Sequence, residues 1–188
     1  GRTTDLAEVK AQNGRVLRED IAAGRTFLRG LPEIVAFHTT ERCNLRCTMC
    51  ERSISQGELQ LPRARLAAIC DDLFPTARKV ALSGAKGEPL LADFDLVAQK
   101  AREHDVRIPL ITTGTGPDAA LSGWLAPQFD HVNVSVDSAD PATYERIRRG
   151  ARFERLRANL RGIAAHRRQR PDDVLLSLSA VVMRRGGR

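Results

Sequence analysis

The sequence predicts an α/β fold, namely a partial, open (β/α) barrel with about five strand–helix units. Five short apolar segments beginning near residues 33, 79, 106, 131 and 174 are typical of strands. The segments between them carry apolar residues at steps of three and four, which is typical of helices. Strand–helix–strand order favours right-handed crossovers and a parallel sheet. A closed eight-unit barrel needs about 250 residues, so a chain of 188 residues predicts an incomplete one.

The predicted elements follow one another along the chain. Val132, Val134 and Val136 share one face of the fourth strand, while Ser135 and Asp137 lie on the other. The expected strands are 33–39, 79–83, 106–112, 131–136 and 174–182. The expected helices are 63–73, 93–104, 118–125, 141–149 and 153–167.

The pattern divides the chain into two parts. We expect an N-terminal helical extension over residues 1–32 and a barrel core over residues 33–188. The core would be truncated at its C-terminal end, because the sixth unit of such a partial barrel has no counterpart in the sequence. This would leave a parallel edge open beside the fifth strand.

Composition and charge restrict the class of protein. The chain is 42% hydrophobic and 28% charged, which fits one globular domain. Its longest apolar stretch, 174–183, is too short for a membrane helix, so we expect a cytoplasmic protein. Lys occurs only at four positions, so Arg supplies 26 of the 30 basic residues behind the net charge of +7. This excess favours either solvated helix faces or an anionic partner. Aromatic residues make up only 4%, which disfavours a nucleic-acid partner.

Three of the four cysteines crowd into one loop after the first strand. Cys43, Cys47 and Cys50 have the spacing C-x3-C-x2-C. Thiolates bind soft metals, and three from one loop can hold three corners of an iron–sulfur cube while the fourth iron lacks a protein ligand. A zinc knuckle formed by these cysteines with His38 or another imidazole is the alternative. Cys70 shares a helix face with apolar residues, so we expect it in the core.

This spacing resembles the hallmark of the radical S-adenosylmethionine (radical SAM) superfamily, and the resemblance covers residues 33–183. The sequence is most similar to the core of SPASM-type members, which carry a Cys-rich C-terminal extension. The resemblance implies a [4Fe-4S] cluster on Cys43, Cys47 and Cys50 whose open iron chelates S-adenosylmethionine. It implies reductive cleavage of that cofactor to a 5'-deoxyadenosyl radical, which takes hydrogen from a substrate.

The resemblance also implies partners. The electron donor would be a flavodoxin or a ferredoxin, and the likeness to SPASM-type members implies a peptide substrate. The Arg excess allows an anionic small molecule instead. The sequence itself does not identify the substrate, and it assigns no side chain a catalytic role. A second interpretation is a non-catalytic scaffold that carries a cluster or zinc and docks a partner protein.

Further motifs carry the resemblance to the ends of later strands. Met49 stands where the family usually has an aromatic residue against the adenine. The run 83–90 looks like the family's Gly-Gly-Glu turn, which implies that its residues hold the methionine amino group of the cofactor: Gly84, Gly87, Glu88 and Pro89. Ser135 and Asp137 would contact the ribose and methionine ends. Thr113 replaces the amide of the family's Thr-Asn-Gly sequence.

Overall fold

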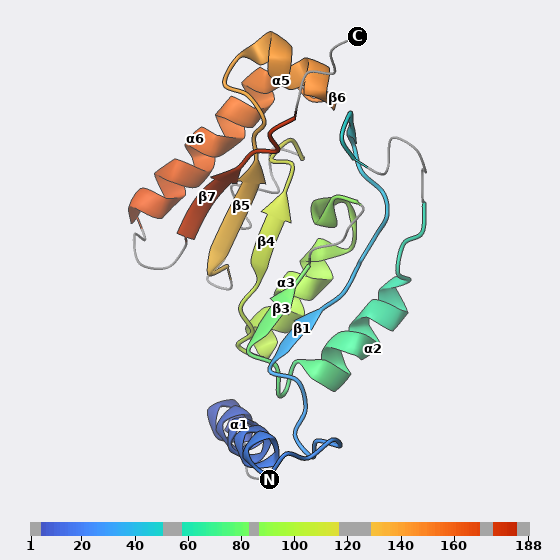
Figure 1. The fold of residues 1–188 in the computed structure, drawn as a ribbon, viewed down its shortest axis with the longest axis vertical. Helices are drawn as coiled ribbons and strands as arrows, with labels where there is room; N and C mark the ends of the chain where they lie inside the picture. The colour runs from blue at the N-terminus through green and yellow to red at the C-terminus, as the bar shows by residue number, and fades with distance from the viewer. Residues whose placement is uncertain (1–4, 51–57, 83–86, 117–128, 170–174, 184–188) are drawn as a thin grey trace.

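The computed structural model describes residues 5–50, 58–82, 87–116, 129–169 and 175–183. Five strands form two parallel sheets. In the first, β1 (Ile34–Ala36) pairs with β3 (Lys79–Ala81). In the second, β5 (His131–Ser135) lies between β4 (Pro109–Thr112) and β7 (Leu175–Ser179). A single parallel bridge between Lys79 and Arg107 connects the two groups. The predicted five-strand parallel arrangement is confirmed, and it does not close into a barrel (Figure 1).

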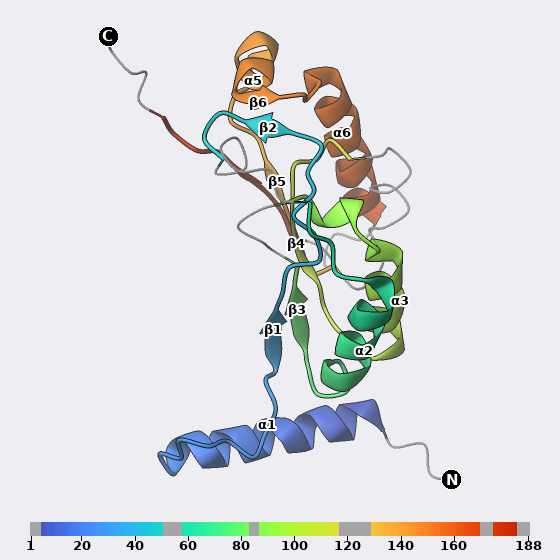
Figure 2. The ribbon, with the colours of Figure 1, turned by 90° about the vertical axis from the view of Figure 1, so that its right-hand side faces the viewer.

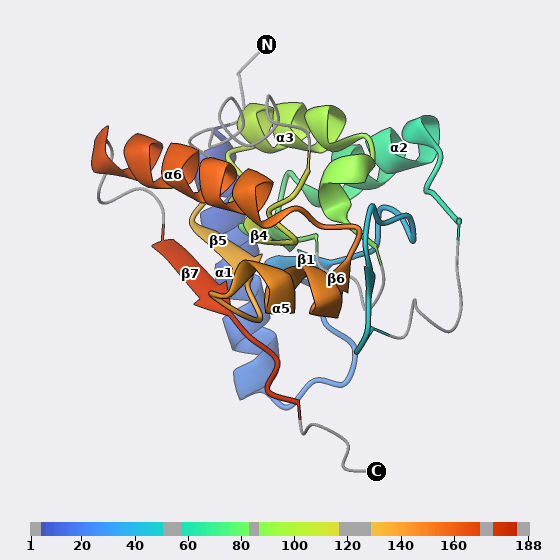
Figure 3. The ribbon, with the colours of Figure 1, turned by 90° about the horizontal axis from the view of Figure 1, so that it is seen from above.

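Three helices cover one side of these strands: α2 (Arg63–Leu73), α3 (Phe94–Glu103) and α6 (Phe153–Gln169). Helix α5 (Pro141–Ile147) lies beyond the carboxyl ends of the strands (Figure 2). Seen from above, α6, α3 and α2 form an arc along one side (Figure 3). The alternating apolar residues of β3 and β5 face these helices: Val80, Val132 and Val134 are fully buried. Alternation along the strands therefore leaves the intervening residues, which include Ser135, on the uncovered side.

The N-terminal helix α1 (Leu6–Ala22) begins at Asp5, whose side chain caps it by accepting from the Ala7 N–H at 3.0 Å. It lies across the end of the strands that is opposite the cysteine loop (Figure 2). The buried Lys10 ammonium donates to the carbonyl oxygens of His104 and Asp105, at 2.6 and 2.9 Å. These bonds join α1 to the turn after α3. The division of the chain at residue 32 stays a prediction.

Two short elements were not predicted. Strand β2 (Arg46–Cys47) pairs antiparallel with β6 (Arg148–Arg149), forming a two-residue ribbon. The predicted helix 141–149 is therefore too long: α5 ends at Ile147, because Arg148 leaves the helical region with ψ 71° and joins the ribbon. The second element is the 3-10 helix η2 (Pro89–Leu91). The predicted helix 118–125 lies outside the described residues.

The described helices have ordinary lengths and composition. None of them combines the length and apolar character that crossing a membrane requires.

Candidate functional site

The cysteine loop lies at the carboxyl ends of the strands and is fixed from three directions. The β2–β6 ribbon holds Cys47, and the Thr48 N–H donates to the Ile147 carbonyl at 2.8 Å. The Asn44 amide donates to Thr115 Oγ1 at 3.1 Å, beyond the end of β4. The Glu88 N–H donates to the Arg42 carbonyl at 2.8 Å. Segments far apart in sequence therefore position the loop.

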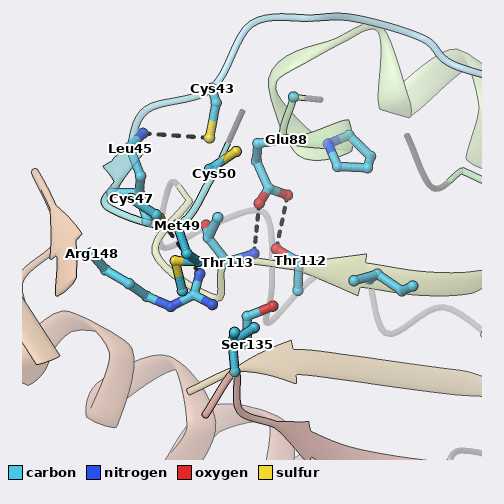
Figure 4. Close-up of a pocket in the computed structure, with 14 residues that line it drawn as sticks. Cys43, Leu45, Cys47, Met49, Cys50, Glu88, Thr112, Thr113, Ser135 and Arg148 are labelled. Atoms are coloured by element: carbon cyan, nitrogen blue, oxygen red, sulfur yellow. Dashed lines mark hydrogen bonds between the residues drawn. The ribbon is translucent and has the colours of Figure 1, made fainter. Parts of the chain in front are cut away.

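A cavity of about 310 Å³ opens beneath this loop. Figure 4 shows thiols of the loop on one side, with Glu88, Thr112, Thr113, Ser135 and Arg148 converging from the strand ends. Its wall is formed by Cys43, Leu45, Cys47, Met49, Cys50, Gly87, Glu88, Pro89, Ile111, Thr112, Thr113, Ser135, Arg148 and Val181. The position fits the general rule that ligands of parallel α/β folds bind outside the carboxyl ends of the strands.

All three loop thiols line this cavity. Cys43 and Cys50 are half-buried and Cys47 is 9% exposed. The Leu45 N–H donates to Cys43 Sγ at 3.4 Å. Burial raises the pKa of the Cys47 thiol, and the nearby Arg148 cation opposes part of this rise.

The alternative metal ligands lie elsewhere. His38 is not on the cavity wall; it lines a separate hollow with Thr39 and Gln60. Within the described ranges, no three His, Cys, Asp or Glu side chains gather around one position suited to a single metal ion. Cys70 is fully buried among core residues, as predicted, and burial raises its pKa to about 12. Its thiol therefore stays protonated and packs as a small apolar group.

Glu88 is the most buried acidic group in the cavity wall, with 1% of its surface exposed. Its Oε1 accepts from the Thr112 hydroxyl at 2.8 Å, and its Oε2 accepts from the Thr113 N–H at 2.7 Å. Burial raises the pKa of this carboxyl, while the Thr113 and Thr112 donors oppose the rise. The side chain is thus held in one orientation at the end of β4.

Gly87 brings the turn after β3 into close contact with the cysteine loop. Its φ is 96°, a left-handed conformation that favours glycine, and a Cβ there would overlap the Thr40 carbonyl oxygen. Pro89 follows at the first position of η2 and also lines the cavity. Met49 lines it from the loop side. Gly84 lies outside the described residues.

Ser135 and Asp137, at the end of β5, have different environments. Ser135 lines the cavity, whereas Asp137 is not part of its wall. The Asp137 side chain is fully buried, and its Oδ1 accepts from the Val181 N–H at 2.9 Å. Its Oδ2 lies 2.7 Å from Arg148 Nε, but the N–H does not point at that oxygen, so the contact is an ion pair. The structure thus gives Asp137 partners within the chain.

Arg148 lines the cavity, although no motif in the sequence singled it out. It is 7% exposed, and its Nη1 lies 3.9 Å from Cys47 Sγ, within hydrogen-bonding range of sulfur. The adjacent Tyr144 is fully buried, and its hydroxyl has no hydrogen-bond partner in the described structure. Arg148 is one of 26 arginines, and nothing in the sequence distinguishes it from the others. Only the pairing of β2 with β6 brings Arg148 to a cysteine 101 positions away.

The donor set fits an iron–sulfur cluster with a bound amino acid-like ligand. Three thiols reach one cavity from a single loop, which matches a cube held at three corners. Glu88 provides a buried carboxylate for a cation, and Gly87 removes the side chain where the backbone must come close. The fold and this site define an iron–sulfur enzyme core built on an incomplete α/β barrel.

Comparison with known proteins agrees with this class. The family model described as the Radical SAM superfamily matches residues 37–175. The chain therefore belongs to the radical SAM superfamily, a family of enzymes that use a [4Fe-4S] cluster and S-adenosylmethionine.

Two relatives by sequence carry the name GTP 3',8-cyclase. The chain is 37% identical over 131 residues to a probable GTP 3',8-cyclase of Methanothermobacter thermautotrophicus, covering 64% of this chain and 40% of the relative. It is 35% identical over 133 residues to GTP 3',8-cyclase 2 of Mycobacterium tuberculosis, covering 67% and 36%. The chain thus spans well under half the length of these relatives.

Solved structures share the fold at low identity. The protein anSMEcpe, with bound AdoMet and the Cp18Cys peptide, aligns with TM-score 0.63 and 19% identity over 80% of this chain and 44% of its own. SuiB of Streptococcus suis, bound to precursor peptide SuiA, aligns with TM-score 0.64 and 17% identity over 93% and 38%. They confirm the partial-barrel fold predicted from the sequence.

Proposed function

We propose that this chain is the catalytic core of a radical SAM enzyme, which binds a [4Fe-4S] cluster through Cys43, Cys47 and Cys50 and cleaves S-adenosylmethionine reductively. One observation carries the proposal: the three thiols and the buried Glu88 carboxylate line the same cavity of about 310 Å³. When bound, the cluster would supply the electron that splits the sulfonium, giving methionine and a 5'-deoxyadenosyl radical for hydrogen abstraction.

Residues of the cavity wall would contact the ammonium group, the adenine and the ribose of the cofactor. The Glu88 carboxylate would accept from the methionine ammonium, since both charges are stabilised when they are paired away from water. The backbone at Gly87, together with Pro89, would lie against the same end, and Gly84 belongs to the same turn in the sequence. Met49 would pack on the adenine ring. The Ser135 hydroxyl would bond the ribose.

Glu88 is suited to this contact because its carboxylate is held in one orientation before a ligand binds. The Thr112 hydroxyl and the Leu90 N–H donate to Oε1, and the Thr113 N–H donates to Oε2. Since a carboxylate has about four acceptor sites, Oε2 keeps acceptor capacity for a donor in the cavity. Since its orientation is fixed before the ligand arrives, binding costs little side-chain entropy. The assignment of Asp137 changes: we propose that it acts through Arg148 rather than by touching the cofactor.

The relatives favour an anionic small molecule as substrate over a peptide. The two cyclases are named for GTP and share 35–37% identity with this chain. The peptide-bound structures share only 17–19% identity and support the fold alone. The net charge of +7 is consistent with a polyanionic substrate. We therefore propose a nucleoside triphosphate as the first substrate class to test, with a peptide as the second.

The test is anaerobic reconstitution of the chain with iron and sulfide, followed by dithionite and S-adenosylmethionine. Support requires about four irons per chain and formation of 5'-deoxyadenosine. Stimulation by GTP, but not by unrelated peptides, would support the nucleotide class. The electron donor of the flavodoxin or ferredoxin class can then replace dithionite.

Three outcomes would contradict the proposal. A cluster that forms without cleavage of S-adenosylmethionine would instead support the non-catalytic scaffold. Stoichiometric zinc that resists replacement by iron would support the zinc-bearing alternative. A triple Cys43, Cys47, Cys50→Ala variant that still yields 5'-deoxyadenosine would exclude the cysteine assignment.

A further inference from the structure

We propose that Arg148 raises the reduction potential of the cluster held by the cysteine loop, and that Asp137 partly opposes this effect. The inference rests on the proposed function, because it concerns a cluster on Cys47. It gives roles to a buried ion pair that the cofactor contacts proposed above leave unused.

The first step is geometric. The β2–β6 ribbon places Cys47 directly opposite Arg148, and alternation turns both side chains to the inner face. Arg148 Nη1 lies 3.9 Å from Cys47 Sγ, while its Nε lies 2.7 Å from Asp137 Oδ2. A single guanidinium thus contacts a cluster thiol and a carboxylate at the end of β5. It is a positioning residue, since it acts through Cys47.

The second step is electrostatic. The side chains of Arg148 and Asp137 are 8% and 0% exposed, so water screens their charges weakly. One-electron reduction adds a negative charge to a cluster. A cation that donates to a ligating sulfur stabilises that added charge and raises the potential, as hydrogen bonds to cluster sulfurs do generally. The Asp137 carboxylate works in the opposite direction, so the pair sets an intermediate value.

The third step is the comparison with the neighbouring residue. Arg149 carries the same charge on the same two-residue strand, but it is exposed on the outer face, opposite Arg46. Solvent and salt screen its field. Charge alone therefore does not distinguish the two arginines, whereas burial and contact with sulfur do. Arg149 is the matched control.

The experiment is a dye-mediated redox titration of the reconstituted full chain, followed by electron paramagnetic resonance of the reduced cluster without S-adenosylmethionine. Removing Arg148 alone would leave the Asp137 carboxylate buried without a counter-charge, which risks unfolding. The informative pair is therefore Asp137→Asn against Asp137→Asn/Arg148→Gln, which differ only in the cation. Urea unfolding checks that each variant is folded.

We expect Asp137→Asn to raise the reduced-to-oxidised ratio at a fixed poised potential. The double variant should lower this ratio about tenfold relative to Asp137→Asn, which corresponds to 59 mV for one electron. Arg148→Lys in the Asp137→Asn background keeps the charge, so it should recover most of that loss. Arg149→Gln should stay within about twofold of the wild type.

Equal ratios for Asp137→Asn and the double variant would overturn the inference, as would an equal shift in Arg149→Gln. If the wild type assembles the cluster and cleaves S-adenosylmethionine in that case, only the tuning role fails. If the wild type binds no cluster, the proposed function and this inference fail together.

Discussion

The Thr112 hydroxyl lies 2.8 Å from Glu88 Oε1, joining the end of β4 to the turn after β3. Both residues are buried, and Thr112 Oγ1 also accepts from the Gly114 N–H at 3.1 Å. This hydroxyl therefore fixes both the carboxylate and the backbone of the next loop. Its two roles make Thr112 a sensitive probe of the cavity.

Thr112→Val removes the hydroxyl but keeps a side chain of similar volume, so it should reduce ligand affinity and stability without changing the packing. The substitution leaves the Gly114 N–H without its acceptor and leaves Glu88 Oε1 with only the longer bond from the Leu90 N–H, at 3.4 Å, which costs about 1–3 kcal/mol of unfolding free energy. S-adenosylmethionine affinity should fall about tenfold, the equivalent of about 1.4 kcal/mol. Urea unfolding and equilibrium dialysis with the cluster-loaded chain measure the two effects. Thr112→Ser keeps the hydroxyl and should retain most of the affinity; if Ser and Val behave alike, the hydrogen bond has no role.

The raised pKa of Glu88 predicts that the free energy of unfolding depends on pH. Its pKa is raised by burial, whereas the unfolded chain titrates near the ordinary value of about 4.3. The folded state therefore holds the proton over a range where the unfolded state has released it. The stability from this group is complete below the unfolded pKa and is lost as pH rises through the folded pKa. Glu88→Gln should abolish this loss, which denaturant unfolding at a series of pH values will detect.

Ionisation of Glu88 should increase ligand affinity, although it decreases the stability of the fold. The proposed ammonium contact needs an ionised carboxylate, so S-adenosylmethionine affinity should increase as pH rises through the folded pKa of Glu88. Glu88→Gln should bind more weakly and lose that dependence. Equal pH profiles for the wild type and Glu88→Gln would show that Glu88 does not contact the charged ligand.

The amount of retained iron should distinguish the three loop cysteines from Cys70. Replacing Cys43, Cys47 or Cys50 singly by Ala should sharply reduce the iron retained after gel filtration, because each thiol holds a separate corner. Cys70→Ala removes a buried thiol of the same chemistry, and should cost about 1 kcal/mol of stability while retaining full iron. Loss of iron in Cys70→Ala, with a folded chain, would contradict the assignment of the ligands.

Local patterns in the sequence determined much of the fold. Helix 63–73 agrees with α2 at both ends, because its apolar spacing is regular. The cysteine spacing likewise identified the loop without any knowledge of its surroundings. The ribbon between Cys47 and Arg148 could not be found in this way. A two-residue strand has no measurable period, and its pairing depends on the path of the intervening chain.

The environment of Asp137 shows the same limit within the site. Its position two residues after Ser135 predicted a shared direction toward the cavity. The structure instead surrounds its carboxylate with Arg148 and the Val181 N–H. Ser135 lines the cavity and Asp137 does not, because these distant partners hold the Asp137 carboxylate, and no local pattern encodes them.

Gly87 offers a test that separates backbone strain from close approach. Gly87→Ala should destabilise the chain in two ways, since its φ of 96° strains a side chain and the new Cβ would overlap the Thr40 carbonyl oxygen. Gly24 also has a positive φ, of 63°, but has open space around it. Gly24→Ala should therefore cost only about 1–2 kcal/mol and leave the cavity intact.

The difference between these two glycine variants reports the contact between the turn and the cysteine loop. We expect Gly87→Ala to lower the melting temperature more than Gly24→Ala and to reduce iron retention as well, because moving Thr40 shifts the loop that begins at Arg42. Differential scanning calorimetry and iron analysis on both variants provide the measurement. Equal destabilisation with equal iron would mean that the close approach of Gly87 to Thr40 does not support the cysteine loop.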